Sequence, residues 1–181
     1  SQLSYIMFGL ACLSPVAMTG ALLHALFHAA IKTTLFMCAG AIILNTGKHR
    51  VSEMRGVGRL MPKTIWCWTL GALGLIGIPP TSGFISKWYL ATGALSTDIG
   101  IFSYLGPIIL LVSALLTAGY LLPITMRGFF PGEEFEGVRG EKEAPVKMLI
   151  PLVIMAAAVV LMGVLPNPFI NYLSCICSGL M

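Results

Sequence analysis

Charged side chains are scarce in this sequence. Only 10% of the 181 residues are Asp, Glu, Lys or Arg, whereas a typical soluble domain has about 25%. Because 57% of the residues are hydrophobic and the mean hydropathy is +0.90, the chain lacks the polar residues needed to cover a soluble fold. The net charge of +4 is small, which argues against nucleic acid as a partner. We expect an all-α polytopic transmembrane helix bundle, with the lipid bilayer as its solvent.

Metal-ligand and redox motifs are also lacking. The five cysteines show no spacing typical of zinc, iron–sulfur or redox sites, and no histidine accompanies the last two. We interpret them as buried or lipid-facing thiols. We therefore expect no metal site, no cofactor and no redox chemistry in this chain. The first residues also lack the basic segment of a secretory signal and an initiator methionine. The cysteines are Cys12, Cys38, Cys67, Cys175 and Cys177.

Long apolar runs are what the sequence has in abundance. A membrane-spanning helix needs about 20 consecutive apolar residues. The segment 3–13 is too short to span before Ser14 and Pro15, and we expect it to be the end of a helix that starts earlier. The other apolar runs predict helices over 17–45, 64–97, 101–126 and 148–165, followed by a short amphiphilic tail.

The run 64–97 is interrupted by Pro79 and Pro80, with Gly83 close behind. Consecutive prolines end a helix because they lack the N–H group and their rings clash with the preceding turn. The run therefore predicts two short helices or one broken pair. Short or broken hydrophobic segments are the best sequence pointer to the ion site of a transporter, and Lys87 stands in the second half.

The most informative pattern is the spacing of His24, His28 and Lys32 in an apolar run. Positions i, i+4 and i+8 share one face of a helix, so the three side chains form a polar ladder. A charge at mid-membrane costs about 2.5 kcal/mol or more. We expect a helix that carries three ionisable groups on one face to handle ions or protons.

The chemistry of these residues suits proton transfer. Burial disfavours the charged form of a lysine, so a buried lysine can exchange protons near neutral pH. Histidine titrates near pH 6.5, and the step between ladder positions, about 6 Å, is short enough for one bridging water. Lys32 and Lys87 would be two stations of a proton path, and repulsion between their charges would couple them.

Other interpretations remain open. His24 could serve only as an interhelical hydrogen-bond donor, and Lys87, beside Trp88 and Tyr89, could be an interfacial anchor. We expect Ser86, Ser113 and Tyr120 to give at most polar support. The charged loops 48–63 and 127–147 should face opposite sides if the broken element counts as two crossings, and their Lys and Arg contents are too similar to settle orientation.

Five segments follow one another in an order that resembles the antiporter-like membrane subunits of respiratory complex I, Mrp-type sodium/proton antiporters and energy-converting membrane hydrogenases. They are SQLSYIMFGLA, HALFHAAIKTTLFMCAG, MRGVGRLMPK, GIPPTSGFISKWYL and SALLTAGYLLPITMRGFF. The resemblance covers about residues 1–130. It implies a fold of two inverted five-helix repeats, each with a broken helix. Residues 1–130 would be the second repeat with its first helix truncated, and residues 131–181 a charged loop, a last transmembrane helix and a short tail.

The resemblance also implies roles for single residues. His28 and Lys32 match the H-x-x-x-K of the central helix, and His24 matches a relay histidine. Lys87 matches the charged residue of the broken helix, placed near one membrane face, while Pro79 and Gly83 match its break. By this resemblance Lys32 would be the central proton carrier and Lys87 the terminal one.

The resemblance further implies the setting. The chain corresponds to the C-terminal half of such a subunit, so its partners would be the N-terminal half, other membrane subunits and, in a redox-driven pump, a soluble redox arm. We expect proton or Na+/H+ translocation in a prokaryotic cytoplasmic membrane, by a non-catalytic subunit of an oxidoreductase complex such as NADH:quinone oxidoreductase or a membrane hydrogenase. The alternatives are an Mrp-type antiporter subunit without a redox partner and a structural membrane subunit.

Overall fold

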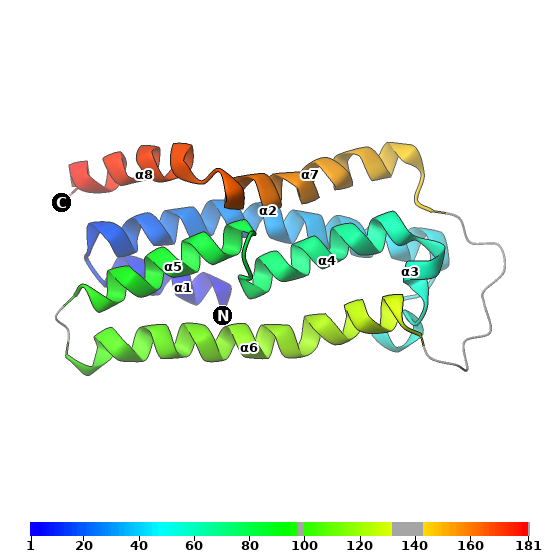
Figure 1. Ribbon diagram of the computed structural model, residues 1–181, viewed down its shortest axis with the longest axis horizontal. Helices are drawn as coiled ribbons and strands as arrows, with labels where there is room; N and C mark the ends of the chain where they lie inside the picture. Colours follow the sequence, from blue (N-terminus) through cyan, green and yellow to red (C-terminus); the bar gives the residue numbers. More distant parts are fainter. Residues whose placement is uncertain (98–99, 132–142, 181) are drawn as a thin grey trace.

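The computed structural model describes residues 1–97, 100–131 and 143–180. Within these ranges the regular elements are all helices, as predicted (Figure 1). They are α1 (Gln2–Ala11), α2 (Pro15–Thr46), the 3-10 turn η1 (Val51–Glu53), α3 (Val57–Leu60), α4 (Pro62–Ile76), α5 (Ser82–Leu95), α6 (Ile101–Phe129), α7 (Val146–Val164) and α8 (Asn167–Leu180).

Helix α2 lies at the centre of the bundle and packs against α1, α4, α5, α7 and α8. Its 32 residues give a length of about 48 Å. Pro15 stands in the first turn, where its missing N–H group costs no hydrogen bond. The helix ends at Gly47, whose φ of 65° is left-handed and whose N–H group donates to the carbonyl of Ile43. The helix predicted over 17–45 is therefore confirmed, with its observed end one residue later, at Thr46.

Helices α4 and α5 form one broken crossing. They contain 15 and 14 residues, about 22 Å each, and neither is long enough to cross a bilayer alone. In Figure 1 they lie end to end alongside α2, with the segment Gly77–Thr81 between them at about the middle of the bundle. The break, which the two prolines predicted, therefore lies at mid-depth, and the pair crosses the membrane once.

Because α4 and α5 together cross the membrane only once, the two charged loops lie at the same end of the bundle. The N–H group of Gly56 donates to the carbonyl of Arg127 over 3.0 Å. Glu143 lies toward the C-terminal end of the second loop. Its carboxylate accepts from the N–H group of Lys63 at 2.8 Å and from the Thr64 hydroxyl at 2.7 Å. The loops were expected on opposite sides only if the broken element counted as two crossings, and this condition is not met.

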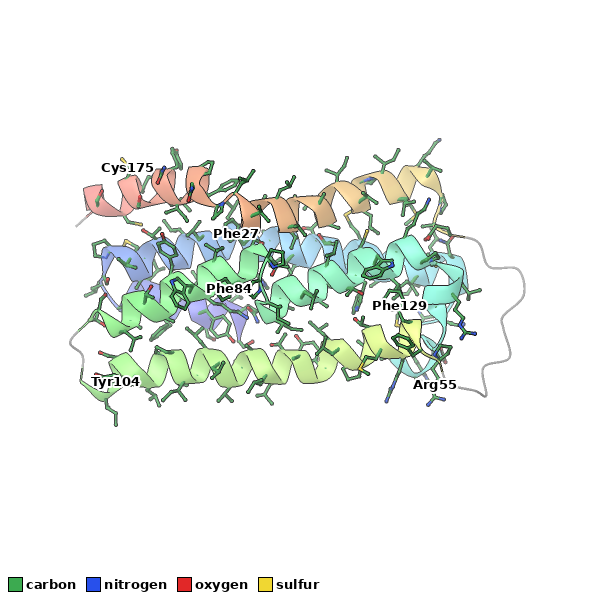
Figure 2. All side chains as sticks on the ribbon, in the orientation of Figure 1. Phe27, Arg55, Phe84, Tyr104, Phe129 and Cys175 are labelled. Atoms are coloured by element: carbon green, nitrogen blue, oxygen red, sulfur yellow. The ribbon has the colours of Figure 1, made fainter. Side chains whose placement is uncertain are left out.

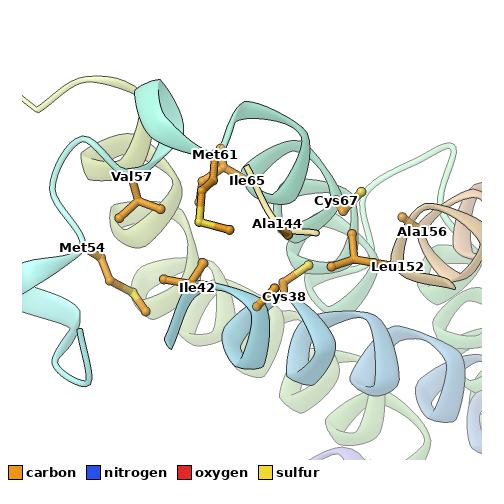
Figure 3. Packing of buried hydrophobic residues seen from close by; sticks show 11 residues of the cluster. Cys38, Ile42, Met54, Val57, Met61, Ile65, Cys67, Ala144, Leu152 and Ala156 are labelled. Carbon is orange, nitrogen blue, oxygen red and sulfur yellow. The ribbon is translucent and has the colours of Figure 1, made fainter. Parts of the chain in front are cut away.

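A hydrophobic cluster joins the helices next to these loops. Figure 3 shows Ile42 of α2, Ile65 of α4 and Leu152 of α7 pointing toward one another. Two of the predicted buried thiols, Cys38 and Cys67, belong to this cluster. The cluster holds α2, α4 and α7 together at the end of the bundle that carries the charged loops.

Close backbone approaches surround the break. A Cβ atom on Gly83 would collide with the carbonyl oxygen of Gly74, so α5 packs directly on the last turns of α4. On α7, a Cβ atom on Gly163 would collide with the carbonyl oxygen of Pro80. Helix α8 then continues past α7 along α2 (Figure 1), and the predicted tail is this 14-residue helix. The glycines let α7 cover the break without a gap.

Within the described ranges, three helices are long and apolar enough to cross a membrane, namely α2, α6 over Ser103–Phe129, and α7. Their outer faces carry large apolar side chains. On α6, for example, Leu115 is 65% exposed and Leu116 69% exposed. In Figure 2, Arg55 and Phe129 lie at one end of the bundle and Tyr104 at the other, with stick side chains covering the outside between them. This surface suits lipid or other membrane helices, and the chain is an integral membrane protein.

Candidate functional site

The three ladder residues lie on α2 as their spacing predicted. The rings of His24 and His28 stack, with centroids 5.8 Å apart and planes inclined by 14°. His24 is 3% exposed, whereas His28 and Lys32 are half-buried. From His24 to Lys32 the ladder rises about 12 Å along the helix axis, so it covers the central part of α2.

His24 is held by one residue on each side. Its Nδ1 atom lies 2.9 Å from the hydroxyl of Ser86 on α5, and its Nε2 atom lies 3.1 Å from the side-chain oxygen of Gln2 on α1. The Ser86 hydroxyl also donates to the carbonyl of Gly83 over 3.1 Å. All three side chains of this string are buried. The string runs from α1 through α2 to the first turn of α5.

Lys87 lies at the break. Its ammonium group donates to the carbonyls of Leu75 and Ile76 over 2.8 and 2.7 Å. These are terminal carbonyls of α4, and a cation there is stabilised by the helix dipole and by the unpaired acceptors. The ammonium therefore lies at mid-depth and not near one membrane face. This position also argues against the interfacial-anchor interpretation, although Trp88 beside it is exposed.

Tyr5 of α1 stands between the lysine and the ladder. Its ring centroid is 5.5 Å from that of His24, in an edge-on arrangement, and 5.7 Å from the Lys87 ammonium nitrogen. The Tyr5 hydroxyl is buried and has no hydrogen-bond partner among the described residues. Neither Tyr5 nor Gln2 was predicted from the sequence as a site residue. Their spacing of three residues within an apolar segment, which places them on one helix face, was the available signal.

Lys32 occupies a different environment, facing α4 and α6. Its ammonium nitrogen lies 5.5 Å from the centroid of the Phe36 ring. It lines a cavity of about 230 Å³ together with Trp68 and Tyr120. The indole N–H group of Trp68 is buried and has no partner in the described part of the chain. The rest of the lining is apolar, so Lys32, Trp68 and Tyr120 supply the polar groups of this cavity.

The three residues that were expected to give polar support lie in three different environments. Ser86 binds His24 directly, and Tyr120 lines the cavity beside Lys32. Ser113 lines another cavity, of about 530 Å³, which lies between α1 and α6 and reaches Tyr5. Pro79, Pro80 and Gly83 all lie at or beside the break, as predicted.

The assembled site is a row of ionisable and polar side chains inside a helical membrane protein. It runs from Lys87 past Tyr5 to His24, His28 and Lys32, next to a helix broken at mid-depth. Ionisable groups beside a discontinuous helix are typical of membrane subunits that handle ions. The chain belongs to the family described as NADH:quinone oxidoreductase/Mrp antiporter, TM, which matches residues 1–117.

Relatives of known name come from several complexes. NADH-quinone oxidoreductase subunit N of Desulforudis audaxviator is 37% identical over 94% of this chain and 36% of that protein. F(420)H(2) dehydrogenase subunit N of Methanosarcina mazei is 30% identical over 94% of this chain and 35% of that protein. A Na(+)/H(+) antiporter subunit of Alkalihalophilus pseudofirmus is 30% identical over 95% of this chain and 34% of that protein. The chain spans about a third of the length of these curated relatives.

Solved structures share the fold. A chain of the Mrp complex from Dietzia sp. DQ12-45-1b superposes with a TM-score of 0.84 at 20% identity, covering 99% of this chain and 40% of that one. A chain of respiratory complex I from Thermus thermophilus gives 0.83 at 23% identity, covering 99% and 36%. At these identities the similarity shows the fold alone. The broken-helix bundle is thus an architecture common to both kinds of complex.

Proposed function

We propose that this chain forms part of a proton-translocation path in a multisubunit membrane complex. The observation that carries the proposal is a row of side chains in which Lys87, Tyr5, His24 and His28 follow one another at 5.5 to 5.8 Å, measured to the ring centroids. Lys32 lies one helical turn beyond His28. Both families of named relatives, the NADH-quinone oxidoreductases and the sodium/proton antiporters, support ion transport as the common activity.

Each residue of the row has a definite part in this proposal. Lys87 and Lys32 hold protons at the two ends of the row, and His28 and His24 pass them between the lysines. Lys87 is stabilised as a cation by two carbonyls of α4, whereas Lys32 contacts an aromatic ring beside a cavity. Because the two sites stabilise a positive charge to different degrees, a single proton binds more strongly at one lysine than at the other.

Repulsion supplies the coupling. Two lysine charges in a low-dielectric interior repel each other, so protonation of one favours release from the other. An event outside this chain that brings or removes a charge near one lysine would then move a proton along the row. The partners that would supply this event are other membrane subunits and, in a redox-driven complex, a soluble redox arm.

Replacing Lys32 by alanine tests the proposal. The complex is purified from its native membrane through a tag on this chain, reconstituted in vesicles, and proton flux is followed with a pH-sensitive dye. We expect K32A to assemble but to lose at least tenfold in proton flux, since its row has no carrier at one end. Lys147 is exposed at the end of the bundle with the charged loops, so K147A is the matched control and should transport normally.

The outcomes separate the alternatives. Normal flux in an assembled K32A complex would refute the proposed path and favour a structural subunit. Mass spectrometry of the purified complex identifies the setting, since iron–sulfur or flavin subunits indicate a redox-driven pump and hydrophobic subunits alone indicate an antiporter. Sodium flux measured in the same vesicles distinguishes Na+/H+ exchange from proton movement alone.

A further inference from the structure

Gln2, His24, Ser86 and the Gly83 carbonyl form a buried chain of hydrogen bonds. Which group donates in each of these bonds depends on how many protons the His24 ring carries. A neutral imidazole has one donor and one acceptor nitrogen, whereas the protonated ring has two donors. The Gln2 oxygen and the Gly83 carbonyl only accept, and the Ser86 hydroxyl has one hydrogen to donate. The number of protons on His24 therefore decides which way the hydroxyl points.

Two arrangements are available: the protonated ring keeps all of these hydrogen bonds, and the neutral ring gives up the one from Ser86 to Gly83. With the ring protonated on both nitrogens, Nε2–H donates to Gln2, Nδ1–H donates to Ser86, and Ser86 donates to Gly83. With the neutral ring, Nε2–H still donates to Gln2, and the Ser86 hydroxyl turns from the Gly83 carbonyl to donate to Nδ1. In both arrangements Nε2 carries a hydrogen, because the Gln2 oxygen at 3.1 Å can only accept it. Only the proton on Nδ1 comes and goes.

We propose that Gln2 is a positioning residue that keeps the Nε2 atom of His24 protonated, so that the proton which His24 takes up and passes on is the one at Nδ1, the nitrogen that faces Ser86. The inference rests on the proposed role of His24 as a relay. It makes α1 part of the path, and it gives the relay a direction toward α5, which carries Lys87 next to Ser86. The titratable groups facing the His24 ring are Tyr5 from α1, Lys87 from α5 and His28 from its own helix.

Nitrogen-15 NMR of histidine-labelled complex reads the tautomer directly, because protonated and bare ring nitrogens have distinct chemical shifts. The His24 signals are assigned by their loss in a His24→Asn variant. We expect the neutral ring of the unmodified protein to be protonated at Nε2. In Gln2→Met, which keeps the side-chain length but removes the acceptor, we expect the proton to move to Nδ1, where Ser86 and Gly83 still accept in series.

Transport provides the second measurement. We expect proton flux in Gln2→Met to fall about tenfold, since a hydrogen bond to the charged ring is lost. Gln2→Glu keeps an acceptor at the same place and should retain the Nε2–H tautomer and a higher flux than Gln2→Met. The control is Thr19→Val, because Thr19 is buried on α2 and, among the described residues, its hydroxyl bonds only to the carbonyl of Pro15 one turn away. It should change neither the tautomer nor the flux.

Two results would overturn the inference: a neutral His24 that is bare at Nε2 in the unmodified protein, or a Gln2→Met variant with unchanged tautomer and flux. Failure of the proposed function looks different. If His24→Asn transports protons normally, His24 is not a relay, whatever its tautomer. If His24→Asn loses transport and Gln2→Met does not, the relay stands and only the role of Gln2 is refuted.

Discussion

Removing the Lys87 ammonium should loosen the break between α4 and α5. The structure gives this group two carbonyl partners, on Leu75 and Ile76, at 2.8 and 2.7 Å. In Lys87→Met both oxygens lose their donor in an interior where water does not replace it readily. A hydrogen bond to a charged group contributes about 1.5–3 kcal/mol, so losing two should cost the local structure about 2–4 kcal/mol after relaxation.

Amide hydrogen exchange of the purified complex measures this cost. The N–H groups of Gly77 and Ile78 both donate to Leu73 at the end of α4, and they open when the last turn frays. A cost of about 2–4 kcal/mol corresponds to exchange faster by about 30-fold to 1,000-fold, if opening is local. Peptides that cover residues 70–85 should show the change, while those from α7 should not.

Two lysine variants serve as controls for this experiment. Lys87→Arg keeps the charge and the donors, so the break should stay protected. Lys32→Met removes a lysine that contacts an aromatic ring and not a backbone carbonyl, so exchange at the break should be unchanged. Unaltered protection of residues 70–85 in Lys87→Met would refute the conclusion that the lysine stabilises the end of α4.

Two further predictions follow from the packing and the topology. Gly83→Ala should prevent assembly, since its Cβ atom would collide with the Gly74 carbonyl, while Gly40→Ala, with open space around it, should assemble normally; equal yields on a gel of the native complex would contradict this. The end with both charged loops should face the cytoplasm by the positive-inside rule, which counts Lys and Arg and gives acidic residues little weight. In cysteine-depleted protein, a membrane-impermeant maleimide added to whole cells should therefore label Ser96→Cys and spare Ser52→Cys. The reverse labelling would show the opposite orientation.

Local patterns account for what was predictable. The ladder of His24, His28 and Lys32 follows from helix periodicity and needs no partner to define it. The break follows from the chemistry of two adjacent prolines, and the end of α2 follows from a glycine at the right place. Ser86 was named only as polar support, yet it binds His24 across 62 residues of sequence. The spacing of residues along the sequence does not show that His24 is the partner of Ser86.

The missed residues and the unpredicted placement of the charged loops have a common cause. Gln2 and Tyr5 act on His24 and Lys87 because α1 packs against α2 and α5, and helix packing depends on the shapes of whole faces. The two charged loops meet because α4 and α5 lie end to end, which the sequence of the break does not specify.

The sequence by itself determined that this is a helical membrane protein with ionisable groups on one face of a long central helix, because composition and periodicity act locally along the chain. The tertiary structure decided which atoms those groups meet: Lys87 on the carbonyls of α4, and His24 between Gln2 and Ser86. Such contacts join segments far apart in sequence, and they form only when the faces of several helices pack together.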